Sequence, residues 1–150
     1  MNGVELFLLG RTLMKIGEEA LPTEGIGDQP ASVRTVLIVV SDVRAYPGSA
    51  IGEIAARTGL PQSAVSGAVA RLREAGAVVA DPDPRDRRRL LIQPAPELSD
   101  RVEAVRSTSI DAALATALGS TDPQAVARIT VLLEELARHL TPQALTRLRG

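Results

Sequence analysis

SAIGEIAARTGLPQSAVSGAVARLREAGAV, Ser49 to Val78, is the stretch that decides the fold. Ala55 is small enough for two helices to cross closely, and Gly59 can take the left-handed conformation that a tight turn needs. Pro61 suits the start of a second helix, and Gly76 suits the position just after its end. Apolar residues recur at helical spacing on both sides of the turn: Ile54, Leu60, Val65, Val69 and Leu72. The stretch therefore predicts a helix-turn-helix.

A charged hairpin is predicted directly after this motif. Val78 and Val79 on one side and Leu90 to Ile92 on the other are strand-like, and DPDPRDRRR, Asp81 to Arg89, lies between them. A helix-turn-helix followed by such a hairpin is a winged helix. Its second helix enters the major groove of DNA, and its hairpin tip lies along the backbone or in the adjoining minor groove. The sequence thus predicts a mainly α (α+β) fold, a winged helix-turn-helix with a two-stranded β wing.

The loop of this wing carries charges of both signs. Arg85 and Arg87 to Arg89 stand among Asp81, Asp83 and Asp86. We expect the aspartates to orient guanidinium groups through short-range ion pairs, Asp86 with Arg88 above all, while exposed arginines meet phosphates or a narrow minor groove. Exposed ion pairs contribute only about 0–1 kcal/mol to stability, so stability alone is a poor reason for the cluster. The alternative is a hairpin tip that is simply solvated.

The composition narrows the class of protein. A chain of 150 residues with 45% hydrophobic and 23% charged residues suits one folded domain. One Phe, one Tyr and no Trp leave few stacking platforms, which argues against a binder of single-stranded nucleic acid. The lack of Cys excludes disulfides, thiolate metal sites and thiol-based sensing, and it favours the cytoplasm. Apolar runs such as Val36 to Val40 are too short to span a membrane, so we expect a soluble protein that is not exported.

Helices are predicted on both sides of the winged helix. Before it, Val4 to Ala20 has a broad apolar stripe, Leu21 to Pro30 reads as a loop, and Ser32 to Arg44 resumes a helix. After it, Glu97 to Leu118 reads as one long helix that Gly119 ends. A last long helix starts at Pro123, and a short piece follows from Pro142 to Leu148. Because apolar end helices need burial and one small reading module makes few contacts, the sequence predicts a homodimer that binds a pseudo-palindromic operator. The alternative is that these helices pack within the monomer.

The wing segment Asp83-Pro84-Arg85-Asp86-Arg87-Arg88 resembles the wing signature of the MarR-type (multiple antibiotic resistance regulator) transcription factors. The resemblance extends over essentially the whole chain. It implies a single domain over residues 1–150, with the winged helix-turn-helix at about 31–96 between dimerisation helices at about 1–30 and 97–150. Three positions depart from the family pattern: Gly67, where a basic residue is common, the pair Ala80 and Asp81, and Pro94-Ala95.

The resemblance also implies which residues contact double-stranded DNA. Arg88 would enter the minor groove with Asp86 holding it, and Arg85 and Arg87 would accompany it on the wing. Arg71 and Arg73 would lie near phosphates. The residues expected to face the major groove are Gln62, Ser63, Ser66, Gly67 and Ala70. Such short side chains have little capacity for bidentate contacts to guanine, so we expect modest sequence discrimination that depends on DNA shape.

The expected function is a cytoplasmic transcriptional regulator, a homodimeric repressor that a small-molecule effector releases. Similar regulators respond to small aromatic or amphipathic acids, and Arg11, Arg34 and Arg44 could meet a carboxylate, although the sequence assigns no ligand residue. No cofactor or metal is expected. An enzyme is not indicated, because His139 is the only histidine and Ser63 and Ser66 lack a partner base. The alternative function is a winged-helix module for protein interaction or assembly, in which the arginine wing meets an acidic partner.

Overall fold

The structure is a computed structural model that describes residues 1–22 and 30–150. The chain forms two compact units, one made of Met1–Gly25 with Val105–Leu140 and the other of Ile26–Ala104 with Thr141–Gly150. Residues 23–29 of the predicted loop lie outside the described part. The predicted boundaries near residues 31 and 96 stay predictions.

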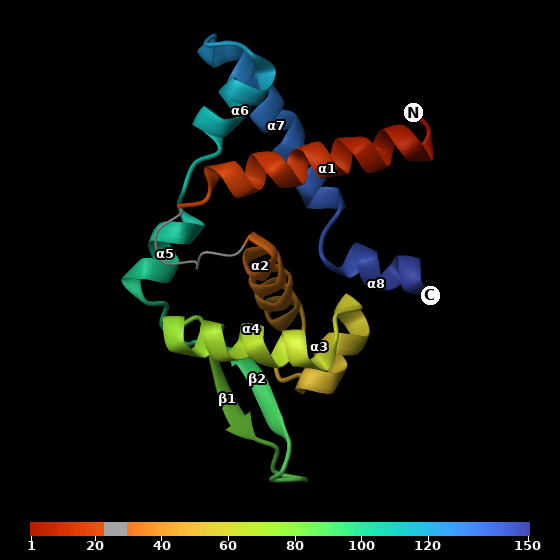
Figure 1. Cartoon of the computed structure of the whole chain (residues 1–150), viewed down its shortest axis with the longest axis vertical. Coiled ribbons are helices and arrows are strands. Elements are labelled where there is room, and N and C mark those ends of the chain that lie inside the picture. Colours follow the sequence, from red (N-terminus) through yellow and green to blue (C-terminus); the bar gives the residue numbers. More distant parts are fainter. Residues whose placement is uncertain (23–29) are drawn as a thin grey trace. The chain divides into compact units, whose positions relative to one another are not determined.

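The predicted helix-turn-helix is formed by α3 (Ile51–Thr58) and α4 (Gln62–Ala75), and α2 (Pro30–Ala45) packs against both of them (Figure 1). Gly59 ends α3 at φ +75° and Gly76 ends α4 at φ +81°, both in the left-handed region that favours glycine. The side chains that close the seam are fully or almost fully buried: Val39 and Val43 of α2, Ile54 and Ala55 of α3, and Val65, Ala68, Val69 and Leu72 of α4. The prediction of a mainly helical winged helix-turn-helix is confirmed.

The wing is an antiparallel pair of strands, β1 (Val78–Pro82) and β2 (Leu90–Pro94), with Ala80 opposite Ile92. Ile92 is fully buried in the same core. The backbone of Ile92 also forms hydrogen bonds with the segment before α3. The N–H of Gly48 donates to the Ile92 carbonyl (2.9 Å), and the Ile92 N–H donates to the Ser49 carbonyl (2.8 Å). The wing is therefore anchored at its base, while its turn projects beyond the helices (Figure 1).

The predicted single helix from Glu97 to Leu118 is two helices, α5 (Asp100–Arg106) and α6 (Asp111–Leu118). Residues 107–110, Ser-Thr-Ser-Ile, interrupt it. Ser109 uses its hydroxyl oxygen to accept the N–H of Asp111 (3.1 Å). Short hydroxyl side chains compete with the helical hydrogen-bond ladder in this way, so apolar periodicity across such a run overestimates helix length.

The other unit contains α1 (Gly3–Ala20), α6 and α7 (Pro123–His139), with α6 packed against both long helices. Asn2 and Glu5 cap α1 reciprocally, and Asp122 caps α7 by accepting the N–H of Gln124 (3.0 Å). Among the described residues of this unit, only Leu114 and Val126 are buried. The large apolar side chains left exposed lie mainly on the two long helices: Val4, Leu6, Phe7, Leu8, Leu9 and Met14 on α1, and Val131, Leu132 and Leu136 on α7.

The last element is the short helix α8 (Gln143–Arg149), which belongs to the same compact unit as the helix-turn-helix. Among the described helices, none is both long and apolar enough to cross a bilayer.

Candidate nucleic-acid interface

The surface of α4 that faces away from the core carries the residues expected in the major groove. Gln62, Ser63, Ser66, Gly67 and Ala70 are all exposed, at the spacing of one helix face. Arg73 is exposed near the end of the helix, and Arg71 is half-buried. A Cβ added at Gly67 would meet no atom within 4 Å, so packing does not require a glycine there. The face is small, polar and free of bulky side chains.

The wing turn is organised by its aspartates, which bind backbone groups. Asp83 Oδ1 accepts the N–H of Arg85 (2.9 Å), and Asp86 Oδ1 accepts the N–H of Arg88 (3.1 Å). Two backbone bonds close the turn, Asp83 N–H to the Arg89 carbonyl (2.8 Å) and Arg89 N–H to the Asp86 carbonyl (2.9 Å). The ion pair expected between Asp86 and the Arg88 guanidinium is replaced by this backbone bond. An Asx turn restrains only one short side chain, whereas an exposed ion pair must also order a long arginine.

The guanidinium groups of Arg85, Arg87 and Arg88 are consequently available at the tip. All three side chains are exposed, and no carboxylate of the described chain pairs with them. Arg89 differs, because its Nη2 lies 2.5 Å from Glu53 Oε1 on α3. The tip therefore presents three guanidinium groups that are not engaged in ion pairs, while the carboxylates of Asp83 and Asp86 remain in the same turn.

Glu53, which the sequence analysis did not single out, joins the wing to the helix-turn-helix. Its Oε1 also accepts the N–H of Ala50 at the start of α3 (3.0 Å). That backbone bond, assisted by the charges of Arg89 and Arg57, holds the pKa of Glu53 below its usual value. The residue three positions earlier is Ala50, which has no side-chain oxygen to accept the second bond of a capping box. The sequence therefore lacks the Ser or Thr three residues before Glu53 that would indicate a capping box.

A partly buried ion pair joins α3 to α2. Arg57 of α3 donates to both carboxylate oxygens of Asp42 on α2 (Nε–Oδ1 3.0 Å, Nη2–Oδ2 2.7 Å) and to the Ser49 hydroxyl (2.6 Å). The Tyr46 ring centroid lies 4.4 Å from the guanidinium carbon. The hydrogen bonds to Asp42 raise the pKa of Arg57, so it remains charged. These contacts fix α2 against α3, and the sequence analysis missed them because the partners lie far apart in the chain.

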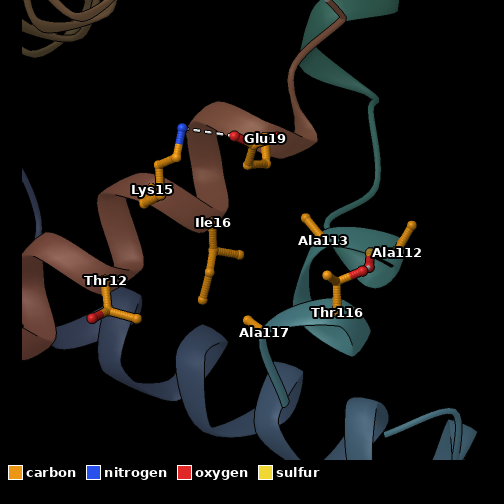
Figure 2. Close-up of a pocket in the computed structure, with 8 residues that line it drawn as sticks. All are labelled: Thr12, Lys15, Ile16, Glu19, Ala112, Ala113, Thr116 and Ala117. Atoms are coloured by element: carbon orange, nitrogen blue, oxygen red, sulfur yellow. Dashed lines mark hydrogen bonds and ion pairs between the residues drawn. The ribbon is translucent and has the colours of Figure 1, made fainter. Parts of the chain in front are cut away.

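A groove of about 450 Å³ lies between α1 and α6 in the other unit (Figure 2). Its lining is largely apolar, with Ile16 pointing between the helices and three alanines of α6 leaving space opposite. Lys15 and Glu19 form an ion pair at its edge (2.7 Å). The hydroxyl of Thr12 donates to its own helix, to the Leu8 carbonyl (3.1 Å). The groove offers apolar surface with charged groups at one rim.

The polar side chains around His139 show no arrangement typical of an active site. His139 is exposed on α7, where its Nε2 lies 3.1 Å from Glu135. Hydrogen bonds from Arg138 and His139 lower the pKa of Glu135. No group of three or more potential metal ligands occurs among the residues that the structure describes.

Comparison with known proteins agrees with this geometry. A model of the MarR family matches residues 35–89, the part that contains α3, α4 and the wing turn. No curated protein sequence matches the chain.

Several solved structures share the fold. A transcriptional regulator of Thermotoga maritima is 20% identical, with a TM-score of 0.54 over 90% of this chain and 92% of that one. A protein of Mycobacterium tuberculosis is 19% identical, with a TM-score of 0.52 over 93% and 95% of the two chains. BpsR of Bordetella bronchiseptica, whose DNA binding is regulated by 6-hydroxynicotinic acid, is 19% identical, with a TM-score of 0.50 over 87% and 96%. The matched segment is the winged helix-turn-helix itself, so this part of the chain is similar to the MarR family, and the solved structures share the fold of the chain.

Proposed function

We propose that two copies of this chain form a repressor that binds a pseudo-palindromic operator and is released by a small-molecule effector. The observation that carries the proposal is the wing tip, where Arg85, Arg87 and Arg88 are exposed and have no carboxylate partner, in the hairpin that directly follows α4. Closely spaced guanidinium groups repel one another, and a polyanion relieves that repulsion. The activity is binding rather than catalysis, and it would take place in the cytoplasm.

The proposed DNA contacts divide by element. The short side chains of α4 at positions 62, 63, 66, 67 and 70 face base edges in the major groove. Arg88 enters the minor groove, and Asp86 orients it through the backbone of the turn. The phosphate contacts come from Arg71, Arg73, Arg85 and Arg87. Since the α4 face has few groups for bidentate base contacts, most of the affinity comes from phosphates and groove shape.

Dimerisation is supported by the apolar surface of α1 and α7. The exposed fraction is 75% for Phe7 and 63% for Leu132. Burying such a side chain in an interface would stabilise the complex by about 1.5–3 kcal/mol, so these residues favour association. Apolar surfaces this extensive are rare on monomers and mark interaction sites. A second copy covers them in the proposed dimer, which also places two winged helices on one operator.

The groove between α1 and α6 is the proposed effector site. It is large enough for a small aromatic or amphipathic acid, with apolar walls for the ring and Lys15 at the rim for the carboxylate. The ligand named for BpsR, an aromatic acid, belongs to this chemical class. An effector bound there would release DNA only if it binds the DNA-free conformation more tightly.

The experiment is binding to duplex DNA from the protein's own gene neighbourhood, measured over a salt series beside a scrambled duplex of equal length. The proposal predicts tighter binding to one neighbourhood sequence and a linear fall of log affinity with log salt, at a slope of about 0.9 per phosphate contacted. Addition of 6-hydroxynicotinic acid as a probe of the effector class should weaken binding in the parent protein, and less so in the Ile16→Trp variant, whose indole fills the groove. Absence of duplex binding at low salt would contradict the proposal and favour the protein-interaction alternative.

A further inference from the structure

The C-terminal end of α3 is completed by a residue from the far end of the chain. A helix leaves its last four carbonyls without partners in the helix itself. In α3 the first of these, on Ala55, accepts the N–H of Gly59 (2.9 Å). The other three, on Ala56, Arg57 and Thr58, all accept hydrogen bonds from the Arg149 guanidinium of α8, at 3.4 Å for Ala56 and 3.0 Å for Thr58. One side chain thus satisfies every remaining carbonyl of this helix end.

The charge of Arg149 suits this position as well as its donors do. The C-terminal end of a helix carries partial negative charge, and a cation there stabilises it. The guanidinium also lies against the turn, because a Cβ added to Gly59 would stand 3.0 Å from Arg149 Nη2. Arg149 therefore contacts the residues that set the direction of the chain between α3 and α4.

A second contact joins α8 to the helix-turn-helix. The hydroxyls of Tyr46 and Thr146 lie 2.9 Å apart, and the Tyr46 ring stacks on Arg57, which is bound to Asp42. Arg149 and Thr146 lie one turn apart on α8, so the helix is held at two points. Both contacts lie within one compact unit.

We propose that α8 is a clamp that positions the recognition helix: Arg149 fixes the turn from Gly59 to Pro61 and thereby the angle at which α4 meets DNA. Arg149 is a positioning residue and does not itself bind DNA. The link to DNA rests on the proposed function.

The test compares Arg149→Ala with Arg147→Ala, which removes the same charge from an exposed position of the same helix. Amide hydrogen exchange of the free protein comes first. We expect Gly59 and the residues at the start of α4 to exchange about three- to tenfold faster in Arg149→Ala and at the parent rate in Arg147→Ala. Thr146→Val, which keeps the shape and removes only the hydroxyl contact, should act in the same direction and more weakly. Unchanged exchange in Arg149→Ala would overturn the clamp, whatever the protein does with DNA.

DNA binding provides the second readout. Arg149→Ala should bind the duplex about three- to tenfold more weakly with an unchanged salt slope, because no phosphate contact is lost. A slope that falls by about 1.8, one contact for each copy in a dimer, would show that Arg149 binds DNA directly and would overturn its positioning role. A parent protein that fails to bind duplex DNA would instead contradict the proposed function, while the exchange result would still decide whether α8 fixes the turn.

Discussion

Replacing Arg88 by alanine removes a guanidinium that no carboxylate of the described chain neutralises. If each copy in a dimer places this group on a phosphate or in the minor groove, two contacts disappear and the slope of log affinity against log salt falls by about 1.8. Between about 50 and 200 mM salt, the ratio of parent to variant affinity then narrows by roughly tenfold. Fluorescence anisotropy of a labelled duplex over four or five salt concentrations measures this slope directly.

The control is Arg128→Ala, an exposed position on α7 that changes the net charge equally. It should leave the slope at the parent value, because its charge lies on a different element from the wing. Arg85→Ala and Arg87→Ala should each also lower the slope of log affinity against log salt, by at most about 1.8. Parallel lines for the parent and Arg88→Ala would refute the assignment of this arginine to the DNA contact.

Three further predictions concern stability and assembly. Asp42→Ala leaves the guanidinium of Arg57 without its carboxylate partner, so the free energy of unfolding measured in urea should fall by about 2–4 kcal/mol; a loss below 0.5 kcal/mol would show that the pair is not structural. Because the backbone bond to Ala50 and the charge of Arg89 hold the folded-state pKa of Glu53 below its usual value, these interactions stabilise the fold above the unfolded-state pKa, and this stabilisation is lost as the pH falls through the folded-state pKa. The melting temperature of Glu53→Gln should thus lie below that of the parent near neutral pH and converge with it in acid; a difference that does not change with pH would contradict this. Leu132→Glu puts a charge into the proposed contact of α7, twice in a symmetric dimer, and should shift the sedimenting species to the monomer without unfolding it, whereas an unchanged mass would exclude this face.

The parts of the fold that depend on neighbouring residues could be predicted from the sequence. Gly59 and Gly76 mark the ends of α3 and α4 because the left-handed conformation is a local requirement. The two strands of the wing follow from apolar runs on either side of a polar loop. The exposed face of α4 follows from the same helical period that buries Val65, Val69 and Leu72 on the opposite side.

The parts that depend on distant residues could not be predicted. Glu53 and Arg89 are 36 positions apart, and Arg149 and Thr58 are 91 apart, so no period or short motif connects them. Asp83 and Asp86 differ from the expectation through a local interaction: each accepts the backbone N–H of the residue two positions ahead instead of pairing with a guanidinium. The run Ser107-Thr108-Ser109 indicates the break between α5 and α6, because hydroxyl side chains compete with helical hydrogen bonds. The apolar periodicity on both sides of the run nevertheless favoured a single helix.

The wing turn gives a physical reason for acidic residues in a DNA-binding loop. Asp83 and Asp86 shape the turn by accepting backbone N–H groups, and the exposed guanidinium groups of Arg85, Arg87 and Arg88 are left without a carboxylate partner. Arg89 alone is tied back, to Glu53 on α3, which links the wing to the first helix of the motif. The basic charge that could meet DNA is thus concentrated at the tip of a turn whose base is fixed by Ile92.

The proposed function requires two copies to present their arginine wings to one DNA duplex together. Sedimentation equilibrium of a labelled operator duplex with excess protein measures this, because it counts the chains on the DNA. The duplex should gain the mass of two 15.8 kDa chains in a single step, with no populated complex of one chain. A complex that contains one chain, or a duplex whose mass does not change at low salt, would contradict it.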